Sequence, residues 1–306
     1  MTEVVIEKII EMFIILMGGA AAYKAGLVDA DTSRKFSNLL LLCIGPLLIF
    51  QSYQVDFDER LFYGILWTLL ASTVTFAAII ILSELLFRGK NERRAVEKIA
   101  SIYSNCGFIG IPLINGIFGA EGILYMTAYT TVFNLLFWTH GVWVMGGAGS
   151  SLKSAWRNLV NPAIIAIIAG FICFTAQIRL PEVLSAPVQM VASMNTPLAM
   201  IVAGVNVAQG SLLKSMKNLH LYYGTFVKLL VFPVVGIMLL AMMHLDFHVA
   251  FTIFIAMSCP AGAVAIMFAE RYGKDARYAS EFFVMSTALS ALTIPLLSVL
   301  ASSVLG

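Results

Sequence analysis

Charged residues are scarce in this chain, because only 12% of its 306 residues are Asp, Glu, Lys or Arg. Ordinary soluble domains carry roughly twice that share, and hydrophobic residues reach 60% here. This balance excludes a soluble globular domain, in agreement with a mean hydropathy of +0.90. We therefore expect an all-α polytopic membrane protein whose surroundings are the lipid bilayer.

Cysteine is scarce too, and the four cysteines, Cys43, Cys106, Cys173 and Cys259, form no CxxC pair. Their spacing predicts neither a disulfide framework nor a zinc site. Cys106 and Cys259 lie beside the two helix interruptions discussed below. For both, small apolar packing is favoured over a redox or substrate role.

Clustered metal ligands are also missing. His244 and His248 flank Asp246 in a short loop, but no further ligand residues gather around them. We therefore expect no metal ion. No acidic cluster deep in the hydrophobic stretches predicts a sodium or proton site, and no cofactor is expected.

The motifs of intramembrane and soluble enzymes are absent: the chain has no HExxH, GxSxG or DDxxD, so an enzyme is not expected. A channel would need charged rings or a repeated filter sequence, which are missing. The basic run from Arg88 to Lys98 is typical of a cytoplasmic loop rather than of a nucleic-acid surface. A carrier is therefore favoured, with a transporter-like sensor or a channel without coupled transport as the alternative.

About 20 apolar residues are needed to cross a bilayer as a helix. With about this number of residues required for each crossing, the hydrophobic stretches predict ten transmembrane helices. They lie at residues 4–25, 34–54, 60–87, 95–118, 121–146, 159–178, 183–209, 218–243, 247–270 and 278–303.

Lysine and arginine are distributed unevenly between the loops. The odd-numbered loops contain Lys24, Arg34, Lys35, Arg88, Lys90, Arg93, Arg94, Lys98, Lys153, Arg157, Lys214, Lys217, Arg271, Lys274 and Arg277. Since basic loops stay in the cytoplasm, both termini are expected on the non-cytoplasmic side of the cell (inner) membrane.

Two predicted spans contain helix breakers at membrane depth. In the segment Ser104–Gly119 (SNCGFIGIPLINGIFG), Pro112 lacks an amide hydrogen and two glycines lower the cost of unwinding. The segment Met257–Gly262 (MSCPAG) repeats this arrangement around Pro260. Interrupted helices in corresponding halves indicate a transporter's binding site near the midplane.

The two halves echo each other in spacing. Gly19 precedes Pro46 by the same number of residues as Gly170 precedes Pro197. The ends of the halves also correspond, since MTAYT at 126–130 resembles MSTALS at 285–290. Because five spans is an odd number, the second half enters the membrane upside down. We therefore predict two inverted repeats of five helices, residues 1–147 and 148–306.

The first interruption also carries a family resemblance. Asn105, Gly107, Phe108, Gly110 and Pro112 resemble the fourth-span signature Asn-x-Gly-Phe-x-Gly-x-Pro of the auxin efflux carrier family. The segments PLAMIVAG (197–204) and PAGAVAIMFAERYG (260–273) are similar to the seventh- and ninth-span motifs. The short link between spans five and six resembles the compact bacterial type.

This resemblance implies a fold and a mechanism. Broken helices four and nine are expected to cross in an X near the midplane, with the substrate bound there. Spans one, two, six and seven would form a scaffold, often a homodimer, beside a mobile unit that moves like an elevator. The implied substrates are small organic anions, mono- or dicarboxylates such as malate, malonate or lactate.

Half-helices that begin near Pro112 and Pro260 would aim free amide hydrogens at a carboxylate. Asn105 is the main candidate, since its amide either donates to the substrate or replaces a lost helical hydrogen bond. Ser258 takes the equivalent place and either contacts substrate or bonds back to its own helix. The full set of candidate substrate-binding residues is Asn105, Cys106, Gly107, Gly110, Pro112, Ser258, Cys259, Pro260, Ala261, Gly262, Asn195, Asn206 and Asn134.

Other polar residues within the spans leave two interpretations each. Asn195 and Asn206 share a helix face, which either lines the substrate path or holds helices together. His140 either relays protons or is packed and hydrogen-bonded. Lys228 either pairs with the substrate carboxylate or extends its ammonium to the nearby cytoplasmic side, and its position favours the second.

Overall fold

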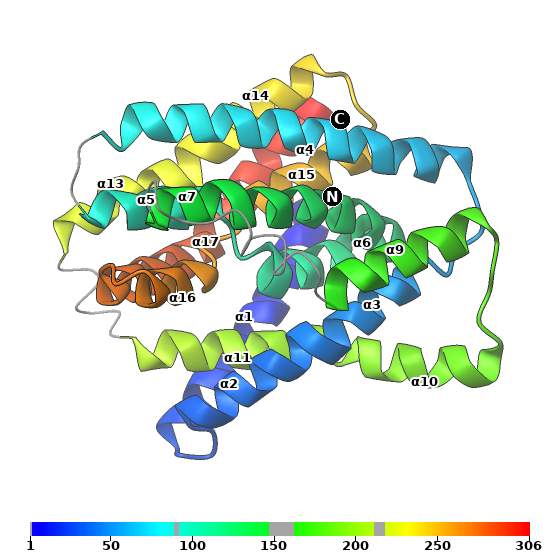
Figure 1. The fold of residues 1–306 in the computed structure, drawn as a ribbon, viewed down its shortest axis with the longest axis horizontal. Helices are drawn as coiled ribbons and strands as arrows, with labels where there is room; N and C mark the ends of the chain where they lie inside the picture. Colours follow the sequence, from blue (N-terminus) through cyan, green and yellow to red (C-terminus); the bar gives the residue numbers. More distant parts are fainter. Residues whose placement is uncertain (1, 89–91, 147–161, 211–217) are drawn as a thin grey trace.

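The computed structural model describes residues 2–88, 92–146, 162–210 and 218–306, and these residues are almost entirely helical. They contain no strand, and their isolated β-bridge joins Ser104 to Ala261. Figure 1 shows α4 (Glu59–Leu86) running along the longest axis of the molecule, whereas α2 (Ala30–Leu39) lies at an angle to it. The prediction of an all-α chain is confirmed.

The first half consists of helices of very different lengths. In chain order they are α1 (Thr2–Lys24), α2 (Ala30–Leu39), η1 (Leu40–Ile44), α3 (Gly45–Ser52), α4 (Glu59–Leu86), α5 (Glu92–Ile102), η2 (Cys106–Gly110), α6 (Ile111–Leu136), η3 (Phe137–Gly141) and α7 (Val142–Gly146). The η segments are π-helical turns, which are wider than an α-helix.

The described helices of the second half are mostly shorter, apart from the last one. They are α9 (Pro162–Thr175), α10 (Glu182–Ser193), α11 (Asn195–Gln209), α13 (Leu219–Phe226), η5 (Val227–Val231), α14 (Phe232–Met242), α15 (Phe247–Ser258), α16 (Val264–Arg271) and α17 (Ala276–Leu305). The predicted division between the halves, at residues 147 and 148, lies outside the described residues.

Within the described residues, six helices are long and apolar enough to cross a membrane. They are Ala30–Ser52, Glu59–Leu86, Cys106–Gly146, Glu182–Gln209, His220–Met242 and Ala276–Leu305. The predicted count of ten includes α1, which carries Glu3, Glu7, Lys8 and Glu11 in its first turns, and α9 with 14 residues. The count of ten stays a prediction.

Prolines account for three of the π-helical turns. The turns η1, η2 and η5 end just before Pro46, Pro112 and Pro233, each of which lies in the first turn of the next α-helix. A proline ring collides with the carbonyl four residues earlier in a regular helix. One wider turn relieves that collision, so these helices continue past the proline instead of ending there.

The boundary predicted between residues 118 and 121 coincides with a sharp kink in α6. Gly119 adopts φ 59° and ψ −140°, a conformation that lies outside the helical region. Only glycine adopts it at little cost, because it has no Cβ. The kink divides the long helical segment Cys106–Gly146 into two parts that run in different directions.

Close glycine contacts join elements from opposite halves. Gly204 of α11 packs against the Leu16 carbonyl of α1, and a Cβ on Gly19 would lie 2.8 Å from the Ile201 Cα. In the same way, a Cβ on Gly170 of α9 would lie 2.6 Å from the Tyr53 ring beside α3. The first helix of each half therefore packs against the proline-containing helix of the other half (Figure 1).

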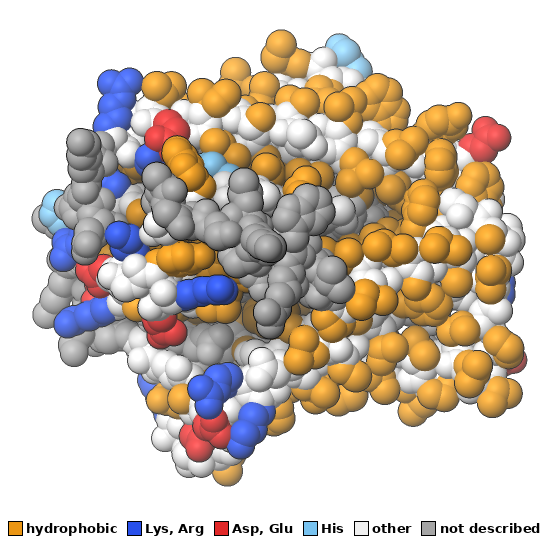
Figure 2. Space-filling model, in the orientation of Figure 1, with side chains coloured by type: hydrophobic (Ala, Val, Ile, Leu, Met, Phe, Trp, Pro, Cys, Tyr) orange, Lys and Arg blue, Asp and Glu red, His pale blue; other side chains and the backbone are white. Residues whose placement is uncertain are grey.

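Apolar side chains dominate the face shown in Figure 2, whereas charged side chains gather at one end. That end includes α2 with Arg34 and Lys35, and α5 with Arg93, Arg94 and Lys98. Large apolar side chains on the outside, such as Leu292 and Leu296 of α17, are more than half exposed. This distribution fits a multi-pass membrane protein. Of the basic residues predicted to be cytoplasmic, Lys90, Lys153, Arg157, Lys214 and Lys217 lie outside the described residues.

Candidate functional site

Two broken helices meet inside the molecule, and we call their meeting point the crossing. It consists of the link Tyr103–Asn105 between α5 and η2, and the link Cys259–Ala263 between α15 and α16. The Asn105 N–H donates to the Pro260 carbonyl at 2.7 Å, and the Gly262 N–H donates to the Tyr103 carbonyl at 3.0 Å. These two bonds flank the antiparallel pair Ser104 and Ala261.

The first half-helix, η2 with α6, starts with amides that lack a backbone acceptor. Its regular bonding begins when the Ile109 N–H donates to the Asn105 carbonyl at 3.0 Å, so the amides of Cys106, Gly107 and Phe108 have no carbonyl acceptor in the turn before them. The Cys106 Sγ accepts from the Cys106 and Gly107 amides, and a sulfur atom is a weak acceptor. Gly107 is exposed, and a Cβ there would meet no atom within 4 Å. A helix start of this kind suits an anion.

The link before the second half-helix, α16, has two amides that are bonded to other segments. The Ala261 N–H donates to the Ser286 hydroxyl of α17 at 3.1 Å, and the Gly262 amide is held by Tyr103 as described above. The Gly262 carbonyl accepts from the Ala265 N–H at 3.0 Å. The predicted residues Pro260, Ala261 and Gly262 therefore use their backbone groups to hold the crossing together.

Asn105 lies at the crossing with 6% of its surface exposed. Its backbone N–H and carbonyl are paired, but its side-chain Nδ2 has no hydrogen-bond partner among the described residues. Of the two interpretations of this side chain, a bond from Nδ2 that replaces a lost helical bond is not observed among the described residues. Contact with a substrate stays a prediction. A buried unpaired donor costs about 1–3 kcal/mol, and an acceptor supplied by a substrate would remove that cost.

Ser258, the last residue of α15, is 1% exposed, and its hydroxyl likewise has no partner in the described part of the chain. The expected bond back to its own helix is absent there. A substrate role for Ser258 stays a prediction.

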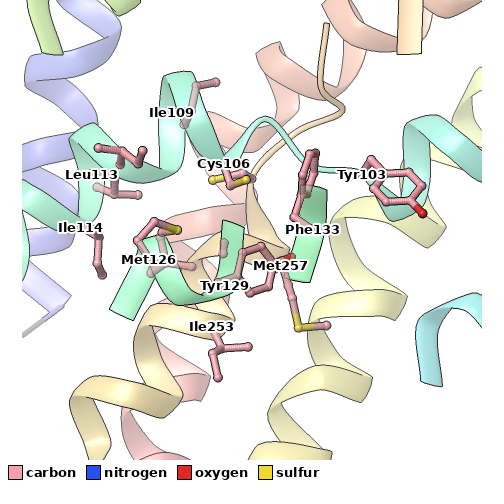
Figure 3. Close-up of a cluster of buried hydrophobic side chains, with 14 of the residues drawn as sticks. Tyr103, Cys106, Ile109, Leu113, Ile114, Met126, Tyr129, Phe133, Ile253 and Met257 are labelled. Atoms are coloured by element: carbon pink, nitrogen blue, oxygen red, sulfur yellow. The ribbon is translucent and has the colours of Figure 1, made fainter. Parts of the chain in front are cut away.

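Cys106 and Cys259 are buried free thiols on opposite sides of Gly110. A Cβ on Gly110 would lie 3.3 Å from the Cys106 Cβ, the Cys259 Sγ and the Met126 Cε. Figure 3 shows Cys106 among apolar side chains that include Met126 and Tyr129. These contacts support the packing interpretation of both cysteines. They also give Gly110 a role, since it allows the two links to approach.

Lys228 is buried at the crossing, with 1% of its surface exposed. It lies in the π-helical turn η5 ahead of Pro233, and its Nζ donates to the Ser104 hydroxyl and to the Met257 carbonyl, the latter at 3.2 Å. The expectation that its ammonium extends to the cytoplasmic side is wrong. The lysine points at both broken helices instead.

His140 and Asn134 are held by local contacts. The His140 Nδ1 lies 3.0 Å from the Tyr103 hydroxyl, which also donates to the Leu136 carbonyl at 2.9 Å. The Asn134 amide donates to the Thr130 carbonyl one turn earlier in α6, at 2.8 Å. Both observations favour packing roles. Through Tyr103, however, His140 is one contact away from the crossing.

Asn195 and Asn206 lie on α11, which packs against α1 and also contacts η2. Asn195 is buried with an Nδ2 that bonds to no described residue, whereas Asn206 is half-buried. An interhelical bond from the Asn195 Nδ2 is therefore not observed. The substrate-path interpretation of this face stays a prediction.

Three potential metal ligands do come together, although none was predicted to bind a metal. One ligand atom each from Glu121, Asp246 and His248 lie within 4.8 Å of one another, and His244 is not part of this group. Arg60 already contacts them, with its guanidinium 2.6 Å from Glu121 Oε1 and 3.1 Å from His248 Nδ1. The arrangement is therefore an ion-pair cluster in which a guanidinium supplies the positive charge.

Sequence reasoning missed three polar residues at the crossing. Ser104 and Ser286 bond the links, and Tyr129 has a buried hydroxyl without a described partner. One available signal was the echo between MTAYT and MSTALS, in which Ser286 corresponds to Thr127. The Thr127 hydroxyl also reaches another helix, since it lies 2.9 Å from the Tyr53 hydroxyl.

Comparison with known proteins gives two findings. A family model described as "Membrane transport protein" matches residues 4–154 and 149–298. A curated protein of Methanothermobacter thermautotrophicus, described as an uncharacterized transporter, is 25% identical over 301 residues, which cover 96% of this chain and 97% of the relative. Both similarities extend over nearly the whole chain.

Proposed function

Since the chain belongs to the membrane transport protein family, the family of the auxin efflux carriers, we propose that it is a secondary active carrier of small organic anions. The resemblance carried by the SNCGFIGIP motif is thereby confirmed, and the chain is a transporter and not an enzyme. The substrate class, the mechanism and the residues that bind are the proposal.

One observation carries the proposal. One half-helix start gathers the hydrogen-bond donors of four residues: the unpaired Nδ2 of Asn105, and the amides of Cys106, Gly107 and Phe108, which have no backbone acceptor. A carboxylate accepts several such bonds at once, and it gains further from the positive end of the helix dipole. Donors without a backbone acceptor at a helix interruption are what a carried carboxylate would need.

The inverted repeat of ten helices is part of this proposal, and two features support it. Helix α1 of the first half packs against α11 of the second, and α9 of the second half packs against α3 of the first. A glycine lies at each of these two contacts. The two links also pair in antiparallel direction at Ser104 and Ala261. Upside-down halves would produce both features.

The way the helices group supports the elevator movement that we propose. The helices α1, α2, α3, α9, α10 and α11 pack on one another, and they correspond to the proposed scaffold. The helices α4, α6, α14, α15 and α17 form a second connected group that contains the crossing. We propose that the second group moves against the first, that scaffold helices form a homodimer, and that both termini face away from the cytoplasm at the inner membrane.

Counterflow in proteoliposomes tests the carrier proposal. Vesicles loaded with unlabelled malate, malonate or lactate receive a trace of the same labelled anion outside, and protein-free vesicles serve as the control. A carrier gives saturable uptake that overshoots transiently. Currents proportional to voltage would indicate a channel, and binding without flux would indicate a sensor; either result would contradict the proposal.

A further inference from the structure

The ammonium of Lys228 is buried without a negative partner. Its two acceptors, the Ser104 hydroxyl and the Met257 carbonyl, are both neutral. No carboxylate of a described residue lies within 4.0 Å of its Nζ, since the ion pairs found there involve other cations. A buried charge of this kind is costly unless an opposite charge joins it.

The position of Lys228 relates it to the donors already described. Its Nζ bonds to Ser104, the residue before Asn105, whose Nδ2 is unpaired. The amides that lack a backbone acceptor begin directly after Asn105, at Cys106. An ammonium has three hydrogen-bond donors, and two of them are used. The same part of the crossing therefore contains the positive charge, one remaining ammonium hydrogen, the Asn105 side-chain amide, and the backbone amides after Asn105 that have no backbone acceptor.

From this arrangement we propose that Lys228 is a substrate-binding residue, and that its ammonium is the fixed positive charge that pairs with a carboxylate of the carried anion. The inference rests on the carrier function proposed above and deepens it. Amides and Asn105 orient the carboxylate, whereas Lys228 makes the site select a charged group over a neutral one of the same shape. The ammonium would offset the charge of one substrate carboxylate in the low-dielectric interior.

A purely structural role is the competing explanation. The Met257 carbonyl lies in the last turn of α15, where a positive charge favours the helix dipole and a donor satisfies a free carbonyl. Lys228 would then only hold the two links together. The two roles differ in a measurable way, because a neutral donor such as glutamine keeps the hydrogen bonds but loses the charge.

Three variants of purified protein separate these roles. Lys228→Gln keeps a donor, Lys228→Met keeps only the stem, and Lys228→Arg keeps the charge. Lys98→Gln is the matched control, because Lys98 is paired with Glu84 at the charged end of the molecule. Binding is measured by thermal shift and calorimetry with two ligands. One is the carboxylate that wild type transports, and the other is its amide, in which an uncharged carboxamide replaces one carboxylate.

Wild type and Lys98→Gln are expected to prefer the carboxylate over the amide. Lys228→Gln and Lys228→Met should bind the carboxylate about tenfold or more weakly and lose that preference, because the charge pair is gone. Lys228→Arg should retain the preference. In the absence of ligand, the unfolding temperature of Lys228→Gln should match that of wild type.

Two results would overturn the inference. One is an unchanged preference for the carboxylate in Lys228→Gln. The other is unfolding of both neutral variants, since the lysine would then hold the crossing rather than pair with an anion. If wild type itself moves no carboxylate, the carrier proposal fails instead, so the two failures are distinguishable.

Discussion

The two links at the crossing differ in how tightly other segments surround them. At the first, Gly107 is exposed, and a Cβ there would meet no atom within 4 Å. At the second, Ser286 and Tyr103 bond the amides of Ala261 and Gly262, and a Cβ on Gly262 would meet three atoms within 3.3 Å. Two glycines beside similar helix interruptions therefore have opposite surroundings, one open and one packed.

Substitution at Gly262 should have the largest effect, because Gly262 lies in the tightly packed link Cys259–Ala263. We call this link the closed break. A Cβ there would lie 3.0 Å from Val264 Cγ2, 3.1 Å from the Tyr103 carbonyl oxygen and 3.3 Å from the Ser104 carbonyl oxygen. Gly262→Val should therefore force the links apart and destabilise the protein by about 1–3 kcal/mol or more. Thermal unfolding in detergent measures this. An unfolding temperature equal to that of wild type would contradict the tight contact.

We call the start of the first half-helix, Asn105–Phe108, the open break, and the matched substitution there is Gly107→Val. Here a Cβ meets nothing within 4 Å, so the fold should tolerate the side chain. Substrate transport should nevertheless fall severely, because the valine would occupy the space before the amides of this helix start. Unfolding temperature and counterflow are measured on the same preparation. Normal transport by this variant would place the substrate elsewhere.

Removing one bond at the closed break should have an intermediate effect. Ser286→Ala leaves the Ala261 N–H without its acceptor, and a buried unpaired amide costs about 1–3 kcal/mol. We expect a lower unfolding temperature with unchanged affinity for the carboxylate. A change in affinity without a change in stability would mean that the second break also binds substrate.

The smallest effect is expected from Asn105→Ala at the open break. The variant loses one donor but keeps the backbone amides, so carboxylate binding should weaken by about threefold to tenfold, as for a single hydrogen bond. Protein level and oligomeric state should stay unchanged, and stability should not fall, because the lost amide had no described partner. Calorimetry with the transported anion measures the difference. Wild-type affinity would remove Asn105 from the site.

The sequence predicted the existence of both breaks better than their form. Pro112 was expected to mark the first interruption, but the link ends earlier, at Asn105, and Pro112 lies in the first turn of α6. A wider helical turn absorbs the proline ring, and sequence spacing does not reveal whether a proline ends a helix or only widens it. In the second half, Pro260 does lie within the non-helical link.

The orientation of Lys228 escaped prediction for a similar reason. Its distance from the neighbouring loop suggested that the side chain reaches the cytoplasmic side, whereas it bonds to Ser104, which is 124 positions away in the chain. Burial of a side chain depends on helices that are distant in sequence, and periodicity within one helix does not report them. The same limit applies to Ser286, whose partner Ala261 lies on another element.

The amino-acid sequence by itself determined the membrane environment, the helical class and the two interruptions, because these follow from composition and from the backbone limits of proline and glycine. Only the tertiary structure decided which amides stay free, which are paired, and where the buried ammonium points. Those outcomes depend on contacts between segments from opposite halves of the chain, such as Asn105 with Pro260. Proline and glycine interrupt the helices, and contacts between distant segments decide which backbone groups at the interruptions stay unpaired.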